Sequence, residues 1–208
     1  MKVAVLGGTG AMGKALARHL SSGYEVIIGS RDQSRAVAAA SGISGASGSD
    51  YKGASRVADV VVFAIPSEAI GLAADLAGEV SSKLVISMIN PMTMEGGLLK
   101  YSPNGGSAAE ELARMLPRSR VATAFNNVPS GFLKRDVVPP VDILVAADSK
   151  ETYAEAAELV TSIREMRPLY AGPLSEARMV EALTPLLLNL ARLNGTKALT
   201  TRFVTLKG

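Results

Sequence analysis

The chain has 208 residues, a length that suits one α/β domain with room for a small carboxy-terminal addition. Its 48% hydrophobic and 20% charged content is ordinary for a folded globular protein, and its 4% aromatic content argues against a stacking platform for single-stranded nucleic acid. The net charge of +3 includes no basic run, which favours a phosphorylated small molecule over DNA as the partner. We expect no nucleic-acid partner.

Cysteine is absent and His19 is the single histidine, which excludes disulfides, thiolate metal sites and histidine clusters for zinc or iron. The longest later apolar runs, 60–65 and the interrupted stretch 182–191, fall short of the roughly 20 residues that span a bilayer. The apolar start at residues 1–6 is too brief for an export signal. We expect a cytoplasmic protein without a metal ion or a membrane partner.

Short apolar runs alternate with helical patterns along the chain, which is typical of parallel strands buried on both faces. This alternation predicts the α/β class: a Rossmann-type, doubly wound, mostly parallel sheet with a small carboxy-terminal α/β extension. The last helix is expected to take Ser175 as its N-cap. The predicted strands are 2–6, 25–28, 59–64, 84–87, 121–125 and 143–146, and the predicted helices are 11–22, 33–40, 67–76, 107–115, 151–163 and 175–193.

Two segments lie outside this alternation. Residues 41–49 are rich in Gly, Ser and Ala, and residues 92–106 contain four Gly and one Pro, so both are predicted to be surface loops. The composition also shifts after Phe125, where an irregular stretch follows the predicted strand. We therefore divide the chain into residues 1–125 and 126–208.

A glycine-rich turn follows the first predicted strand and opens the first predicted helix. It reads G-x-G-x-x-G and has the flanking strand, helix and second strand of a dinucleotide-binding unit. Glycine lets the backbone approach a pyrophosphate, and the helix N-terminus supplies N–H donors to its oxygens. The residues predicted to contact the cofactor are Gly8, Thr9, Gly10, Ala11 and Met12.

The end of the second predicted strand distinguishes NADP from NAD. NAD-binding folds usually place an acidic residue there for the ribose hydroxyls, whereas this chain has Ser30 and Arg31. A hydroxyl and a guanidinium can bind a 2′-phosphate that a carboxylate would repel, so NADP(H) is the expected cofactor. Arg35 either joins this phosphate site or is a solvated helix charge. Asp32 is predicted to cap the helix that follows it.

Two further strand ends point to the nicotinamide. In open α/β folds ligands lie beyond the carboxyl ends of the strands, which places Ile65, Pro66 and Asn90 near the nicotinamide ribose. Ordinary strand-to-helix turns are the alternative interpretation of these residues.

No conventional acid–base pair is evident. His19 falls inside the first predicted helix, and none of the five tyrosines is followed four residues later by a lysine. Hydride exchange between two redox carriers needs no proton in the transfer step, so positioning is the main task. We expect no catalytic side chain.

With the glycine-rich turn, Ser30, Arg31 and the segments 171–178 and 181–189, the chain resembles the NADPH-dependent reductases of coenzyme F420 over nearly its full length. The resemblance implies a Rossmann fold with a small carboxy-terminal part, and direct hydride transfer between a deazaflavin and NADP. It also implies that residues 1–125 bind NADP and that residues 126–208 close the site of the second carrier.

The resemblance carries residue roles with it. Thr9, Ser30, Arg31 and Arg35 match the 2′-phosphate contacts of the family, and Val128, Pro129 and Ser130 match its turn beside the deazaflavin ring. Archaeal members have a histidine just ahead of that turn, where this chain has Asn126. An asparagine there is similar to the related metalloreductase domains, which bind NADP and pass hydride to a flavin. The second carrier is therefore a deazaflavin or a flavin.

Apolar residues recur at helical spacing in the last predicted helix, a pattern typical of a core or a subunit contact. We expect a homodimer contact here, with Leu187 touching the deazaflavin. The residues of this pattern are Met179, Val180, Leu183, Leu186, Leu187 and Leu190.

Two other functions stay open. An imine or hydroxy-acid reductase would need a proton donor near the nicotinamide. Arg178 lies roughly where such enzymes place a lysine, but a guanidinium does not give up its proton readily. A non-catalytic NADP(H) sensor would instead use residues 126–131 to contact a protein partner.

Overall fold

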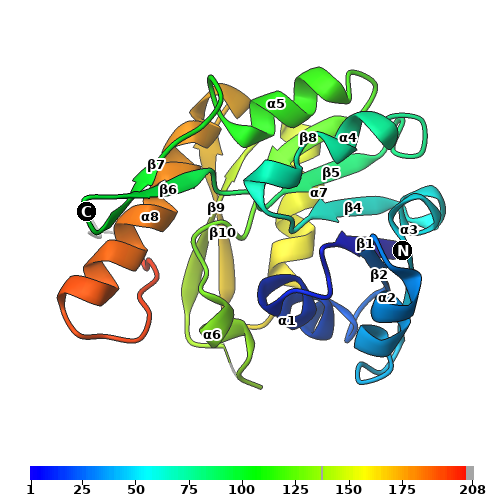
Figure 1. The fold of residues 1–208 in the computed structure, drawn as a ribbon, viewed down its shortest axis with the longest axis horizontal. Coiled ribbons are helices and arrows are strands. Elements are labelled where there is room, and N and C mark those ends of the chain that lie inside the picture. The colour runs from blue at the N-terminus through cyan, green and yellow to red at the C-terminus, as the bar shows by residue number, and fades with distance from the viewer. Residues whose placement is uncertain (137, 205–208) are drawn as a thin grey trace.

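The computed structural model describes residues 1–136 and 138–204, with a twisted sheet of parallel strands at its centre (Figure 1). Six strands pair in the order β3-β2-β1-β4-β5-β8, which is the order of the Rossmann fold. The predicted fold class is confirmed. The strands of this sheet are β1 (Lys2–Leu6), β2 (Glu25–Ser30), β3 (Ala46–Asp50), β4 (Val60–Phe63), β5 (Leu84–Ser87) and β8 (Arg120–Thr123).

Helices cover both faces of the sheet because successive strand residues point to opposite sides. In β1, Val3 and Val5 pack into the core beneath α1, α2 and α7, whereas Ala4 and Leu6 pack into the core beneath α3, α4 and α5. Within the part of the chain that the structure describes, no helix is long and apolar enough to cross a membrane. The helices are α1 (Ala11–Leu20), α2 (Gln33–Ala40), α3 (Tyr51–Val57), α4 (Leu72–Asp75), α5 (Ala108–Met115), α6 (Ser130–Leu133), α7 (Lys150–Thr161) and α8 (Ala177–Leu193).

The carboxy-terminal part adds a second βαβ unit. Strand β9 (Val141–Ala146) pairs in parallel with β10 (Met166–Gly172), and α7 connects them. An antiparallel bridge between Ala122 and Ala147 joins this pair to the central sheet. Strand β10 was not predicted, because Pro168 interrupts its pattern; a proline is tolerated on a sheet edge, where its missing N–H leaves no gap in a ladder.

The prediction of a surface loop at 41–49 is confirmed for residues 41–45 and wrong from residue 46 onward. Strand β3 forms there and α3 follows it directly. The segment has no apolar alternation because β3 is an edge strand held by parallel pairing with β2. Its Gly48 lets α2 approach closely, since a Cβ there would lie 2.3 Å from the backbone nitrogen of Val37.

The prediction of a surface loop at 92–106 is wrong for residues 92–101 and confirmed for residues 102–106. Its first part is an antiparallel hairpin of β6 (Met92–Glu95) and β7 (Leu98–Tyr101). The two-residue turn Gly96–Gly97 has φ values of +56° and +78°. Such tight hairpin turns need positive φ at both positions, which glycine adopts without strain. The Gly-Gly pair between two strands was therefore a hairpin signal.

Two helix boundaries also differ from the predictions. The predicted helix 67–76 is a short 3₁₀ turn, Ser67–Ala69, followed by the single turn α4. Ser175 is not the N-cap of the last helix, because Pro173 starts a 3₁₀ turn at Leu174–Glu176 and α8 begins only at Ala177. The predicted N-cap role of Asp32 is confirmed.

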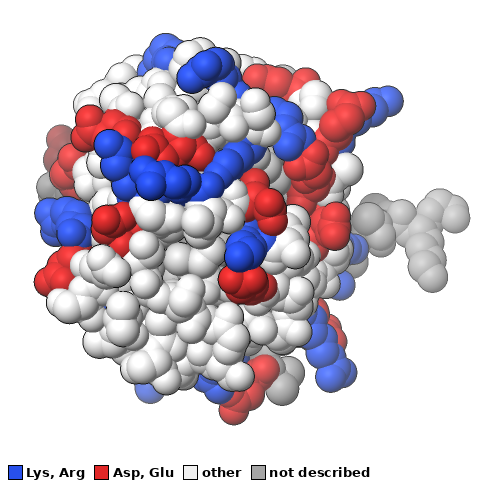
Figure 2. Space-filling model, turned by 90° about the vertical axis from the view of Figure 1, so that its right-hand side faces the viewer, with Lys and Arg blue, Asp and Glu red and all other residues white. Residues whose placement is uncertain are grey.

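The amino ends of the strands lie on the side of the molecule where the N-terminus lies (Figure 1), and Figure 2 views this side. Basic and acidic side chains are mixed on this face (Figure 2). Lys2 and Glu25, the first residues of β1 and β2, form an ion pair at 3.2 Å at this end of the sheet. Exposed pairs of this kind contribute little to stability.

Candidate functional site

A cleft of about 580 Å³ lies at the opposite end, beyond the carboxyl ends of β1, β2 and β4. Loops that follow parallel strands gather at this edge, so residues far apart in sequence meet there. The cleft is lined by these predicted residues: Thr9, Gly10, Ala11, Met12, Ser30, Arg31, Arg35, Ile65, Pro66 and Asn90. It is also lined by residues for which no cofactor contact was predicted: Gly7, Gly13, Asp32, Tyr51, Ala64, Ser67, Met88 and Met92.

The glycine-rich turn shapes the floor of this cleft. Gly7 has a φ of +83°, and a Cβ on it would lie 2.3 Å from the carbonyl oxygen of Ala64. Gly8 is buried behind the turn and does not line the cleft; a Cβ there would lie 2.9 Å from both Ile28 and the carbonyl oxygen of Val5. Gly8 therefore shapes the turn, while its neighbours face the cleft.

Helix α1 points its N-terminus at the cleft. Its N-cap is Gly10, which has no side chain to accept from the first-turn N–H groups, and no acidic residue lies in that first turn. Ala11 and Met12, the first two residues of this helix, line the cleft. Free N–H groups and the helix dipole together favour a bound anion, so the arrangement fits the pyrophosphate of a dinucleotide.

The end of β2 supplies the basic side of the cleft. Ser30, Arg31 and Arg35 face it, and the Asp32 carboxylate accepts instead from the backbone N–H of Ser34 at 2.8 Å and of Arg35 at 3.3 Å. The hydrogen bond from the Ser34 hydroxyl, together with these N–H groups, lowers the pKa of Asp32. This carboxylate therefore serves its own helix, and the arrangement fits a 2′-phosphate.

Tyr51 lies at the same end of the cleft. It is the first residue of α3 and follows the end of β3, so reading β3 as a loop concealed this strand end. Burial raises the pKa of its hydroxyl, which the positive charge of Arg31 opposes, and the hydroxyl stays protonated at neutral pH. Tyr51 thus adds an aromatic surface and a neutral donor beside Arg31.

At the far end of the cleft, Asn90 takes part in a hydrogen-bonded cluster. Its side-chain oxygen accepts from the Asn126 side-chain amide at 3.1 Å and from the Thr184 hydroxyl at 3.1 Å. The Thr184 hydroxyl also lies 2.8 Å from the backbone oxygen of Asn126. The cluster joins the loop after β5, the loop after β8 and helix α8.

A small hollow of about 40 Å³ lies on the other side of this cluster. Asn126, Val128, Pro129 and Leu187, predicted for the second carrier, line it together. Ser130 does not; it begins α6, and its backbone oxygen accepts from the N–H of Lys134. The hollow is completed by Asn127, Thr184, Leu188 and Leu199, for which the sequence carried no motif.

The turn beside the hollow starts from a strained residue. Phe125 is fully buried with a φ of +64°, a left-handed conformation that is rare for a bulky residue. The strain turns the chain sharply out of β8 and brings Asn126 against Asn90. The side-chain oxygen of Asn126 is buried and accepts no hydrogen bond. A buried acceptor of this kind is available to a bound ligand.

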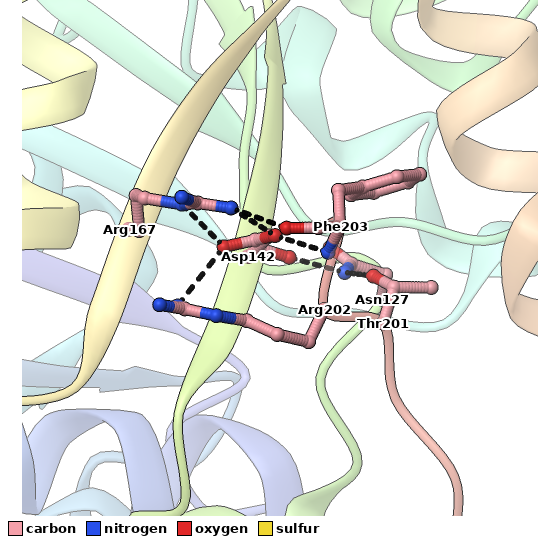
Figure 3. A network of polar contacts seen from close by, with 6 residues as sticks. All are labelled: Asn127, Asp142, Arg167, Thr201, Arg202 and Phe203. Atoms are coloured by element: carbon pink, nitrogen blue, oxygen red, sulfur yellow. Dashed lines mark hydrogen bonds and ion pairs between the residues drawn. The ribbon is translucent and has the colours of Figure 1, made fainter. Parts of the chain in front are cut away.

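A second network fixes the neighbouring Asn127 (Figure 3). The Asn127 side-chain amide donates to the backbone oxygen of Asp142 at 2.7 Å and to the Thr201 hydroxyl at 2.8 Å. The buried Asp142 carboxylate accepts from Arg167 at 2.7 and 2.8 Å, from Arg202 at 3.1 Å and from the N–H of Phe203 at 2.6 Å. The network ties the tail at 199–203 to β9 and to the turn.

The charge state of Asp142 follows from these partners. Burial alone would raise its pKa, but the hydrogen bonds from Arg167 and Phe203 and the charges of Arg167 and Arg202 hold the pKa below its usual value. The carboxylate is therefore ionised and pulls both guanidinium groups toward it.

Helix α8 is anchored to the hairpin and to α5. The fully buried Glu181 carboxylate accepts from the N–H groups of Ala108 and Ala109 and from the Tyr101 hydroxyl, each at 3.0 Å. Burial raises the pKa of Glu181, and the three donors oppose that shift. Asn189 pairs with both backbone groups of Leu99, accepting at 2.9 Å and donating at 2.7 Å. These contacts hold Thr184 and Leu187 at the hollow.

The fold and the cleft define a protein of the Rossmann class with a dinucleotide-type cleft. Residues 2–91 match the family described as "NADP oxidoreductase coenzyme F420-dependent". The F420-dependent NADP reductase of Methanothermobacter thermautotrophicus is 41% identical, with 91% of this chain and 89% of the relative covered. The enzyme of the same name from Methanocaldococcus jannaschii is 35% identical, with 91% and 92% covered.

A solved structure supports the same relationship at the level of the fold. The crystal structure of a putative F420-dependent NADP reductase from Arthrobacter superposes with a TM-score of 0.86 at 24% identity, covering 99% of this chain and 100% of that one. The chain belongs to the F420-dependent NADP reductase family.

Proposed function

We propose that this chain transfers hydride directly between reduced coenzyme F420 and NADP. The proposal depends on one observation, the cluster of Asn90, Asn126 and Thr184 that joins the nicotinamide end of the cleft to the second hollow. Carriers bound on either side of this cluster would have their rings next to each other, and holding two reactants in contact supplies much of a rate enhancement. Residues 1–125 then bind NADP(H), and residues 126–208 close the site of the second carrier.

The described residues suit the parts of NADP(H) in order along the cleft. The N-terminus of α1 takes the pyrophosphate, and Ser30, Arg31 and Arg35 take the 2′-phosphate. Ile65, Pro66 and Asn90 position the nicotinamide end. NADP(H), when bound, supplies or accepts the hydride, and the chain orients it.

The second ring is proposed to lie against Val128, Pro129 and Leu187, with the free Asn126 oxygen as a hydrogen-bond acceptor. No proton moves in the transfer step, so no acid or base is required. His19 is held elsewhere, with Nε2 2.8 Å from the carbonyl oxygen of Leu133. A carbonyl only accepts, so Nε2 carries the proton in this contact.

The alternatives differ in the second substrate. The family relatives favour the deazaflavin over a flavin, an imine or a hydroxy acid. The exposed Arg178 is a poor proton donor for imine reduction. A sensor would bind NADP(H) without turnover.

The test is a mixture of purified protein with NADPH and oxidised coenzyme F420 under anaerobic conditions, followed by absorbance. We expect the deazaflavin band to bleach as NADPH is oxidised, and NADH to be a poor substitute. Reduction of flavin but not of the deazaflavin would support the metalloreductase-like alternative. Reduction of neither would exclude hydride transfer to either ring and leave the imine or hydroxy-acid reductase and the sensor.

We also propose that α8 forms a homodimer contact. Met179, Leu186, Leu190 and Leu193 are 66%, 52%, 39% and 69% exposed and, with the partly buried Leu183, follow the alternating three- and four-residue spacing of a helix-packing seam. Val180 and Leu187 lie on the buried side of the same helix.

The dimer proposal is tested by sedimentation of a charged variant. Leu186→Glu should shift the protein from dimer to monomer, whereas Ser175→Glu, at an exposed position just before the helix, should not. A wild-type protein that sediments as a monomer at micromolar concentration would exclude the contact.

We also propose that the protein is located in the cytoplasm, since the chain has no cysteine for oxidative crosslinking. Recovery of the protein with cytosolic markers in cell fractionation tests this.

A further inference from the structure

A second groove adjoins the cofactor cleft along α1. It has a volume of about 430 Å³ and shares Thr9, Gly10 and Ala11 with the cleft. Helix α1, the segment after α2 and the end of α6 form its walls. The other lining residues are Lys14, Ala15, Arg18, Gly42, Ile43, Leu133 and Lys134.

The lining of this groove carries positive charge. Lys14, Arg18 and Lys134 line it, and none of its lining residues is acidic. Arg18 pairs with Asp136, whose side chain is 81% exposed, while in residues 1–136 and 138–204 neither lysine has an ion-pair partner. Two lysine charges beside a partly neutralised arginine attract an anion with more than one negative group.

The walls of the groove are fixed relative to each other. Leu133 is fully buried in the core, and His19 of α1 lies within hydrogen-bonding distance of its carbonyl oxygen, at 2.8 Å. This contact holds the end of α6, and with it Lys134, against α1. The groove is therefore preformed, which lowers the entropic cost of binding.

The two redox carriers differ in whether the cleft and the basic end of β2 account for their negative charges. The NADP phosphates are accounted for by the N-terminus of α1 and by the basic end of β2. Coenzyme F420 carries a phosphodiester and then glutamate residues on the chain that leaves its ring, so its negative charges lie away from the deazaflavin. The helix that ends at the groove, α6, begins directly after Pro129, which lines the second hollow.

We propose that the groove binds the anionic side chain of coenzyme F420, with Lys14 and Lys134 as its main contacts and Arg18 beside them. This inference rests on the proposed function, because it places the deazaflavin ring over the second hollow, against Val128, Pro129 and Leu187. The groove then distinguishes the complete coenzyme from a deazaflavin that lacks the phosphodiester and glutamates.

The test compares these two deazaflavins on charge-reversed protein. For Lys14→Glu/Lys134→Glu, we expect the dissociation constant of coenzyme F420 to rise about tenfold, as fits the loss of two exposed ionic contacts. The constant for the tail-free deazaflavin, which ends at its ribityl chain, should stay unchanged. Fluorescence titration in the presence of NADP measures both constants without turnover. Added salt should weaken binding of coenzyme F420 but not binding of the tail-free deazaflavin.

Arg118→Glu is the control, because Arg118 is exposed just before β8, at the opposite end of the sheet. It should alter neither constant. An equal change for both deazaflavins, or no change for either, would overturn the groove assignment. Failure of wild-type protein to reduce any deazaflavin would overturn the proposed function, whereas the titration reports on the groove in either case.

Discussion

The nucleotide cleft and the second hollow are built in different ways. The cleft is shaped by backbone: a glycine turn, a helix end and the loops after neighbouring strands, with no room for a Cβ between Gly7 and Ala64. The hollow is lined by side chains from three distant segments, residues 126–129, 184–188 and 199, and its Asn126 and Thr184 are held by hydrogen bonds to Asn90. A site shaped by backbone requires that no added side-chain atom fills its turn. A site shaped by hydrogen-bonded side chains requires that every bonding partner is present.

The largest effect is expected from adding a methyl group to the backbone site. Gly7→Ala places a Cβ 2.3 Å from a carbonyl oxygen at a positive φ, so it should lower the free energy of unfolding by about 3 kcal/mol or more. Urea unfolding measures this. Gly23→Ala, in the same βαβ unit with nothing within 4 Å, should change stability by less than about 1 kcal/mol. Equal effects of the two would refute the steric argument.

The second largest effect is expected from removing the negative charge of Asp142, which holds the tail beside the hollow. Asp142→Asn leaves Arg167 and Arg202 without their anion, which we expect to cost about 2–3 kcal/mol, since both guanidinium groups remain part-exposed. The loosened tail should raise KM for the deazaflavin more than KM for NADPH. Asp136→Asn, which breaks the exposed pair with Arg18, should cost under about 1 kcal/mol. A similar loss in both variants would count against the network.

The same carboxylate predicts a pH dependence. The pKa of Asp142 is lower in the folded protein than in the unfolded chain. The contribution of this carboxylate to the free energy of unfolding is therefore complete above the pKa of Asp in the unfolded chain, near 3.9. It is lost as the pH falls through the pKa of Asp142 in the folded protein. The difference in unfolding free energy between wild type and Asp142→Asn should be constant from neutral pH to about pH 5 and shrink below about pH 4. A difference that does not shrink at all as the pH falls below about 4 would contradict this assignment.

A smaller and more selective effect is expected at the basic end of the cleft. Arg31→Ala should raise KM for NADPH roughly tenfold or more, the value of a charged hydrogen bond, and leave KM for NADH nearly unchanged. Arg114→Ala, on the exposed side of α5, is the matched control. If NADPH and NADH respond equally to Arg31→Ala, this end of the cleft does not bind the 2′-phosphate.

The smallest effect is expected at Thr184. Thr184→Val removes a hydroxyl that holds Asn90 and Asn126, which should cost about 1 kcal/mol, or roughly a fivefold rise in KM for the deazaflavin. Thr161→Val, whose hydroxyl bonds within its own helix, should leave KM unchanged. Identical kinetics for wild type and Thr184→Val would mean that the amide pair holds its position without the hydroxyl.

The difference between a backbone-shaped cleft and a side-chain-shaped hollow also explains which residues could be predicted from the sequence. The Rossmann class and most cleft residues follow from local patterns: a glycine turn after a strand, and Ser30 and Arg31 at a strand end. Thr184 and Asn127 carry no local signal, because their partners are 58 and 74 residues away. Strand β3 was missed because its pairing with β2, not its composition, makes it a strand.

The Asp142 network has a consequence for a chain made from its N-terminus. The backbone contacts that shape the glycine turn lie within residues 5–65. Asp142 and Asn127 instead take partners from residues 200–203, so they stay incompletely paired until those residues have left the ribosome. Because the amino-terminal part of a chain folds first during synthesis, the nucleotide cleft can assemble early. The second hollow is completed only after residues 200–203 have been made.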